Sequence, residues 1–134
     1  MIRIILRLLL AAAFAFAGYA HIINPEGFLT ITPDWVPYPD HVIFWTGVAE
    51  IAGAAGLLIS RLRAAAGWGL AAYTLCVWPA NINHALTDLA MWGGSGEGLS
   101  AAYHIPRLLL QPVIIWWCLW AARIIDWPFR KQPR

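Results

Sequence analysis

The sequence has few charged residues and few cysteines. Asp, Glu, Lys and Arg make up 12% of the 134 residues, whereas hydrophobic residues make up 60% and the mean hydropathy is +0.62. One small core cannot bury that much apolar surface, so the composition excludes an ordinary soluble domain. The net charge is only +2, and the basic residues flank apolar segments, which gives no sign of nucleic-acid binding.

Cysteine-based redox chemistry has no support either. The two cysteines, Cys76 and Cys118, lie inside apolar segments, and the chain has no C-x-x-C motif. Their expected depths differ, which is unfavourable for a disulfide, so we expect small apolar side chains that fill space. The sequence also lacks internal repeats, low-complexity tracts and flexible linkers, and we expect a single domain over residues 1–134.

Long apolar runs are what the chain does have. Four stretches lie at about 4–23, 41–59, 64–82 and 106–125, each close to the ~20 residues that a spanning helix needs. They predict an all-α membrane protein, with four transmembrane helices in an antiparallel bundle. Closely spaced Gly and Ala residues between positions 47 and 56 predict that the second helix is approached closely by its neighbours.

The charges predict how these spans are oriented. The connections 24–40 and 83–105 contain acidic residues and neither Lys nor Arg. Under the positive-inside rule both termini are cytoplasmic and both long connections face outward, in a multi-pass plasma (bacterial inner) membrane protein. Eight of the nine basic residues lie at ends that four antiparallel spans place on one side: Arg3, Arg7, Arg61, Arg63, Arg123, Arg130, Lys131 and Arg134.

A cleaved signal peptide is the alternative interpretation of residues 1–20. They combine early arginines, an apolar centre and a small-residue end. Cleavage would leave three spans with the termini on opposite sides of the membrane. We expect the segment to be retained as the first span.

Glu50 is the most informative residue, because it lies near the middle of the stretch 41–59. A carboxylate at membrane depth costs several kcal/mol unless it is neutral, paired or facing a wet cavity. The other polar residues lie nearly all in the outer half of the predicted bundle. This one-sided distribution predicts a polar pocket that opens outward, with Glu50 at its floor.

Helical spacing groups these outer polar residues into stripes. If the third helix continues past Pro79, residues Asn81, His84 and Asp88 share one face at i, i+3 and i+7, and Tyr73 lies deeper along it. The fourth helix has the same spacing at His104, Arg107 and Gln111, and the first ends with His21 and Asn24. The candidate ligand-binding residues are therefore His21, Asn24, Glu50, Asn81, His84, Arg107 and Gln111, with Glu50 as a candidate proton-exchanging group.

Each of these residues also has a structural interpretation. The histidines could lie at the membrane interface, Arg107 could extend to headgroups, and Asn81 and Gln111 could hydrogen-bond between helices. Three histidines and a carboxylate also raise a metal site, but zinc and iron ligands usually come as close pairs on one helix. Because no two histidines share a predicted helix, we assign no metal.

Four segments resemble small DoxX-like membrane proteins: 18–21 (GYAH), 46–51 (TGVAEI), 78–82 (WPANI) and 107–111 (RLLLQ). The resemblance covers nearly the whole chain and implies a four-helix membrane bundle. It also implies a link to quinone-dependent oxidoreduction, since the family takes its name from a subunit linked to thiosulfate:quinone oxidoreduction. The chain has no cofactor motif that would make it an oxidoreductase on its own.

These observations support two main hypotheses. The first is an outward-facing pocket around Glu50 that binds a quinone-like or isoprenoid amphiphile or a lipid, with a membrane or peripheral redox partner. The second is a non-catalytic accessory subunit, in which a Glu50–Arg107 pair stabilises the bundle. Transport is weaker, because nothing polar lines the inner half. Homo-oligomer formation is left open.

Overall fold

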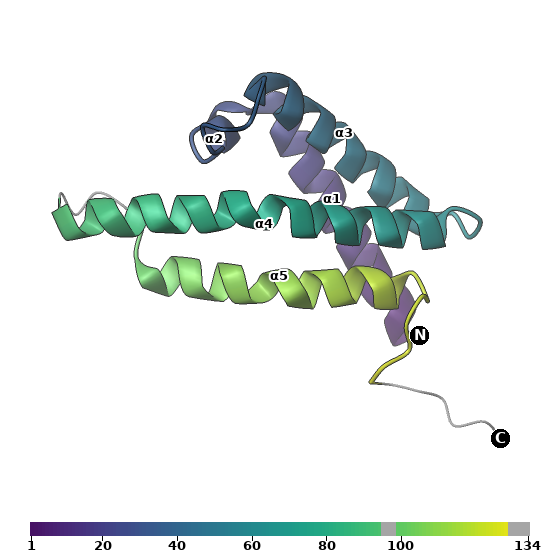
Figure 1. Cartoon of the computed structure of the whole chain (residues 1–134). Coiled ribbons are helices and arrows are strands. Elements are labelled where there is room, and N and C mark those ends of the chain that lie inside the picture. Colours follow the sequence, from purple (N-terminus) through teal and green to yellow (C-terminus); the bar gives the residue numbers. More distant parts are fainter. Residues whose placement is uncertain (95–98, 129–134) are drawn as a thin grey trace.

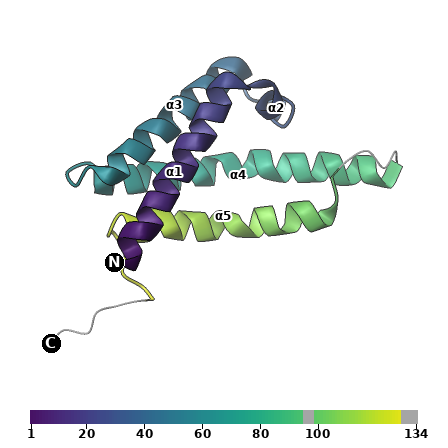
Figure 2. The ribbon, with the colours of Figure 1, turned by 180° about the vertical axis from the view of Figure 1, so that it is seen from behind.

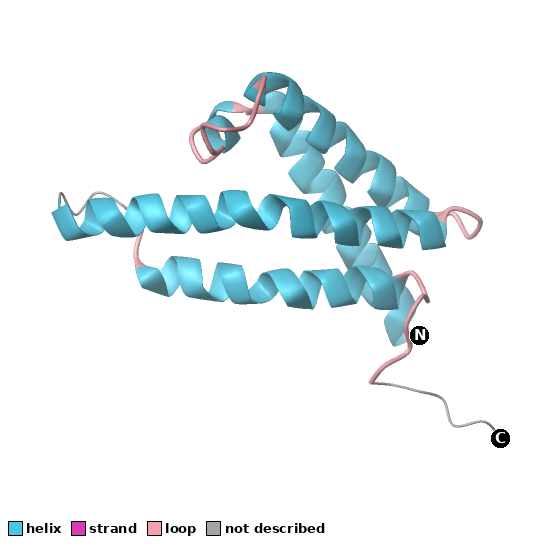
Figure 3. Cartoon of the chain, viewed as in Figure 1, coloured by secondary structure: helices cyan, strands magenta, loops and turns pink. Residues whose placement is uncertain are grey.

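The structure is a computed structural model that describes residues 1–94 and 99–128, without the side chains of 91–94. Across this part of the chain it is all helical and contains no strand (Figure 3). The five helices are α1 (Ile2–Ile23), α2 (Glu26–Leu29), α3 (Pro39–Leu58), α4 (Arg63–Gly94) and α5 (Ala101–Ala121). The all-α prediction is therefore confirmed.

The four long helices form two antiparallel pairs. Figure 1 shows α4 and α5 side by side, with the pair α1 and α3 crossing them at an angle. The pairs meet near the N-terminus of α1 and diverge toward α2, as the reverse view in Figure 2 also shows. One cavity of the molecule is lined by polar residues of all four long helices: His21, Thr46, Asn81 and Arg107.

Glycines allow α1 and α3 to touch. A Cβ on Gly18 would lie 2.5 Å from the carbonyl oxygen of Gly47, and a Cβ on Gly47 would lie 2.7 Å from that of Gly18. Such contacts leave no room for a side chain, so the two backbones approach only because both positions are glycine. The predicted close packing of the second span is confirmed here.

The apolar core lies where the two helix pairs meet. Leu10 of α1, Leu57 of α3, Leu70 of α4 and Cys118 of α5 belong to one buried cluster. At the same end, Arg7 donates from Nε to the carbonyl oxygen of Ala121 at 2.8 Å and ties α1 to α5. This end of the molecule is therefore fixed, whereas the opposite end is open between the pairs.

Two helices, α1 and α3, are long and apolar enough to cross a membrane by length and composition. Of the four predicted spans, the first and the second are thus supported. The helices α4 and α5 fall short because Trp, Gly and polar residues lower their hydropathy. The cytoplasmic flank that we predicted at Arg130, Lys131 and Arg134 lies outside the described residues.

The helices do not have the same bounds as the predicted spans. The third helix continues through Pro79 to Gly94, beyond the predicted span of 64–82. The fourth begins at Ala101 and ends at Ala121, whereas the predicted span was 106–125. Arg123, two residues after the end of α5, has a positive φ of 65°, which a right-handed helix does not accommodate. The short helix α2 was not predicted.

Candidate functional site

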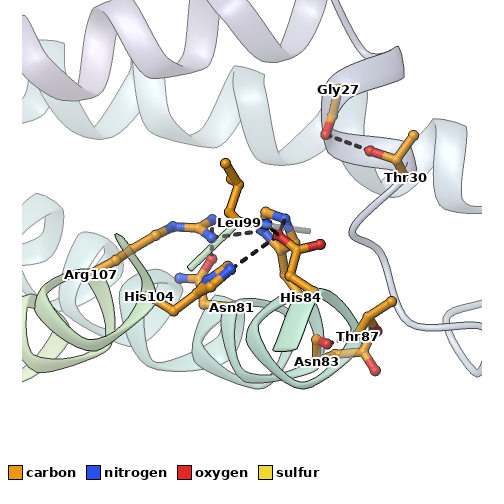
Figure 4. A network of polar contacts seen from close by, with 10 residues as sticks. Gly27, Thr30, Asn81, Asn83, His84, Thr87, Leu99, His104 and Arg107 are labelled. Carbon is orange, nitrogen blue, oxygen red and sulfur yellow. Dashed lines mark hydrogen bonds and ion pairs between the residues drawn. The ribbon is translucent and has the colours of Figure 1, made fainter. Parts of the chain in front are cut away.

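A polar network joins the C-terminal half of α4 to the N-terminal half of α5 (Figure 4). Arg107 of α5 donates from Nη2 to Oδ1 of Asn81 at 2.6 Å and from Nη1 to Nδ1 of His84 at 2.8 Å. His84 and His104 each place Nε2 at 3.0 Å from Oδ2 of Asp88. The Leu99 amide donates to the same oxygen at 3.2 Å. The two predicted stripes therefore face each other.

The contacts of His84 determine its protonation. A guanidinium only donates, so Nδ1 of His84 accepts from Arg107 and Nε2 carries the proton that points to Asp88. A neutral imidazole at pH 7 agrees with this arrangement.

His84, Asp88 and His104 are also close enough to share a metal ion, since their ligand atoms all lie within 4.8 Å of one another. The sequence interpretation did not identify this group, because its members come from two helices. However, the proton that Arg107 places on Nε2 of His84 occupies the position that a metal would need. A metal-bound histidine usually donates its other N–H to an acceptor, and here that nitrogen faces a donor. Hydrogen bonds explain the group better than a metal does.

Glu50 is buried deeper between the helix pairs, with 3% of its surface exposed. Its Oε2 lies 2.8 Å from Nδ1 of His21, but that ring nitrogen is directed at the carbonyl oxygen of Ala17 at 2.9 Å. The hydroxyl of Tyr73 interacts with the same carboxylate. Among the described residues, Oε2 of Glu50 has no partner of hydrogen-bond geometry. The hydrogen-bonding capacity of the Glu50 carboxylate is therefore only partly satisfied.

Two cavities lie between the helix pairs. The first, called the outer cavity because α2 and the segment after it contribute to its lining, has a volume of about 210 Å³. The inner cavity has a volume of about 290 Å³. Both have mainly apolar linings, and both include Tyr73 and Val77, so they are neighbours. The inner one is lined by Leu10, Ala13, Phe14, Ala17, Glu50, Tyr73, Thr74, Val77, Gln111, Ile114 and Trp117.

The cavities divide the predicted site residues into groups. Glu50 and Gln111 line the inner cavity, and Gln111 also donates to the Thr74 carbonyl at 3.3 Å. His21, Asn81 and Arg107 line the outer cavity.

Two predicted residues line neither cavity. Asn24 is the exposed C-cap of α1, and His84 accepts a hydrogen bond from Arg107.

The predicted Glu50–Arg107 pair does not form. Glu50 faces His21 and Tyr73, whereas Arg107 bonds to Asn81 and His84. The physical reason is which helices are neighbours: α3, which carries Glu50, packs mainly against α1 and α4, whereas α5, which carries Arg107, packs mainly against α4 and α1.

Sequence reasoning missed two further contributors. Phe28 of α2 stacks on the ring of His21, with centroids 3.8 Å apart, and thereby closes the outer cavity. Trp117 lines the inner cavity, and its buried Nε1 has no partner among the described residues. Tryptophans are common in membrane segments, so nothing in the sequence distinguished this one.

The comparisons with known proteins correct the predicted family. No curated protein and no solved structure matches the chain. Residues 10–122 match the model of a family described as a domain of unknown function, DUF8561. The DoxX resemblance was therefore wrong, because it rested on short segments, and the link to quinone chemistry that it implied loses its support. The chain belongs to the DUF8561 family.

Proposed function

We propose that the chain is a multi-pass plasma membrane protein with four spans and both termini in the cytoplasm. The support is geometric: α4 and α5 have 32 and 21 residues, long enough to accompany α1 and α3 across a bilayer. Arg107 lies apart from the other basic residues, and its neighbours Asn81 and His84 satisfy two of its N–H groups. A partly buried arginine whose N–H groups are paired in this way is compatible with a span.

Cysteine labelling tests this topology, after Cys76 and Cys118 are replaced by alanine. We expect a cysteine at Thr30 to react with a membrane-impermeant maleimide in intact cells. A cysteine at Arg61 should react only after the cells are broken, because the α3–α4 connection is placed inside. Labelling of both positions in intact cells, or of neither position after lysis, would contradict the four-span proposal.

The proposed biochemical role is binding of an amphiphile, with a hydroxyl or similar polar group held in the inner cavity. The observation that supports it best is a mismatch in that cavity. Its apolar walls enclose a buried acceptor, Oε2 of Glu50, and a buried donor, Nε1 of Trp117. Neither has a partner of hydrogen-bond geometry among the described residues, although Nδ1 of His21 lies 2.8 Å from Oε2. Buried polar atoms without partners cost about 1–3 kcal/mol each, so such a pair favours a ligand that completes them.

A hydroxyl group suits this pair because it donates one hydrogen bond and accepts others. It would donate to Glu50 and accept from Trp117, while its chain occupies the apolar volume. Glu50 could also exchange a proton with a more acidic or basic group at this place. The cavity of about 290 Å³ holds the polar end and part of a chain, and the remainder would extend into the lipid.

Filling the cavity tests this role. Val77 lines both cavities, whereas Leu75 of the same helix is exposed and lines neither. Binding of a brominated dodecanol is measured by the quenching of tryptophan fluorescence. We expect Val77→Phe to weaken this binding by about tenfold or more, since the phenyl ring occupies the ligand's place. Leu75→Phe is the matched control and should bind like the wild type.

Equal quenching curves for wild type, Val77→Phe and Leu75→Phe would contradict binding in the cavity. Water alone could satisfy both polar atoms, and the wild type would then show no saturable quenching.

A second candidate role is structural. Asp88 of α4 accepts hydrogen bonds from His84 of the same helix, from His104 of α5 and from the Leu99 amide. These bonds join α4 to α5. This favours an accessory subunit in which the outer network holds the helix pair together. The roles are compatible, because the network and the inner cavity involve different residues.

A further inference from the structure

Arg107 presents a positive charge to the outer cavity. Arg107 belongs to the cavity lining, together with Asn81 and His21. Among the described residues, that lining contains no acidic side chain, and Glu50 lines the inner cavity instead. The polar end of the outer cavity is therefore cationic and its walls are apolar.

The charge of Arg107 is not balanced by a carboxylate of the described residues, although its guanidinium lies over the Tyr103 ring, 5.8 Å from the centroid. Its two bonded acceptors, Oδ1 of Asn81 and Nδ1 of His84, are both neutral groups. Among the described residues, no carboxylate lies within 4.0 Å of the guanidinium, and Asp88 reaches it only through His84. The network thus holds the arginine in position and leaves further N–H groups for another acceptor, since a guanidinium has five.

We propose that the outer cavity binds the acidic headgroup of a single-chain amphiphile, a carboxylate or a phosphate, through Arg107. This site goes beyond the proposed function, because it concerns a different cavity and a different ligand chemistry. A guanidinium matches the paired oxygens of carboxylates and phosphates, and charge-assisted hydrogen bonds of this kind are about twice as strong as neutral ones. The chain of the ligand would lie along apolar residues such as Ile31, Val42 and Ile43.

Asn81 and His84 act here as positioning residues. They fix two nitrogens of the guanidinium and orient its remaining N–H groups. The phenyl ring of Phe28 and the imidazole of His21 stack on each other and also line the cavity. Because two hydrogen bonds already orient this partly buried arginine, it loses little further side-chain entropy on binding.

The test compares ligands that share one chain and differ in charge. Wild-type protein in nanodiscs of phosphatidylcholine, which has no net charge, is titrated with dodecanoate, dodecyl phosphate and methyl dodecanoate, at a pH above the pKa of the acids. We expect the wild type to bind at least one acid about tenfold or more tightly than the ester. The tighter acid distinguishes a fatty acid from a phosphate headgroup as the natural source.

Variants assign the preference to Arg107. Arg107→Gln should bring the ratio of ester to acid dissociation constants to about one, and Arg107→Lys should retain part of the preference, because it keeps the charge without the planar geometry. Arg61→Gln, at an exposed position in the α3–α4 connection, should behave like the wild type. The ratio is informative even if Arg107→Gln is less stable, since a purely structural change weakens both ligands alike. If Arg107→Gln does not fold, Arg107→Lys carries the test.

Two results would overturn the proposal. The first is equal affinity of the wild type for the acids and the ester. The second is an unchanged preference for the acid in Arg107→Gln, or in Arg107→Lys where only Arg107→Lys folds. Dodecanol binding to the inner cavity is measured in parallel. Its failure would contradict the proposed function and leave the acid site standing, whereas its success with no acid preference would overturn the acid site alone.

Discussion

Replacing Glu50 with glutamine is expected to remove most ligand binding in the inner cavity and to leave the fold almost as stable as before. The amide has the size of the carboxyl group but accepts a weaker hydrogen bond from a ligand hydroxyl. We expect dodecanol affinity to fall by about tenfold or more, the difference between a charged and a neutral hydrogen bond. The free energy of unfolding should change by no more than about 1 kcal/mol.

The small effect on stability follows from the partners of Glu50. Nδ1 of His21 already has the Ala17 carbonyl at 2.9 Å, so it is not left without a partner when the carboxylate is removed. Oε2 of Glu50 has no partner of hydrogen-bond geometry among the described residues, so little is lost there. A structural ion pair would behave differently, because breaking one strands a buried charge and costs about 3–5 kcal/mol.

Controls separate these cases. Glu26→Gln changes the same group at an exposed position on α2 and should affect neither ligand affinity nor stability. The double variant Glu50→Gln/Arg107→Gln should show additive stability effects within about 0.5 kcal/mol, because the two residues do not pair. A large loss of stability with unchanged ligand affinity would refute a binding role for Glu50, and strong coupling to Arg107 would restore the rejected ion pair.

The second large effect concerns the contact between α1 and α3. Gly18→Ala is expected to destabilise the protein by about 1–3 kcal/mol, the usual cost of overpacking. The new Cβ would lie 2.5 Å from the Gly47 carbonyl oxygen, 2.9 Å from Ile51 and 3.0 Å from Cβ of Glu50. Because a backbone carbonyl cannot rotate away, the helices must separate, and the wall of the inner cavity moves with them.

Gly69→Ala is the matched control, since no atom lies within 4 Å of the position of its Cβ. A Gly to Ala change in a helix without a steric conflict stabilises by roughly 0.5–1 kcal/mol, so this variant should be slightly more stable than the wild type. Thermal unfolding in detergent measures both. If Gly18→Ala were as stable as Gly69→Ala, the close approach of α1 and α3 would be incorrect.

Much of the fold could be predicted because helix periodicity and hydropathy are local properties. The apolar stretches located all four long helices, and the closely spaced glycines correctly indicated a tight contact for the second. The helices extend beyond the predicted spans on both sides of the α4–α5 connection. There polar residues continue α4 past Pro79, and hydropathy alone does not detect them as part of a helix.

The candidate site was predictable along each helix but not between helices. The spacing of Asn81, His84 and Asp88 placed them on one face, which the structure confirms through their shared network. Pairing Glu50 with Arg107 was wrong, because depth in a bundle does not indicate which neighbour a side chain faces. The divergence of the two helix pairs, which separates the site into two cavities, has no local signal in the sequence.

The most direct test of the central claim, that the space between the helix pairs holds an amphiphile, is mass spectrometry of the wild-type protein extracted in a mild detergent. We predict one amphiphile species, or a narrow class of them, in near-stoichiometric amount and enriched far above its share of the membrane lipid. That species should be absent from Val77→Phe and retained by Leu75→Phe. Co-purified lipid with the same composition as the bulk membrane in all three proteins would contradict the account.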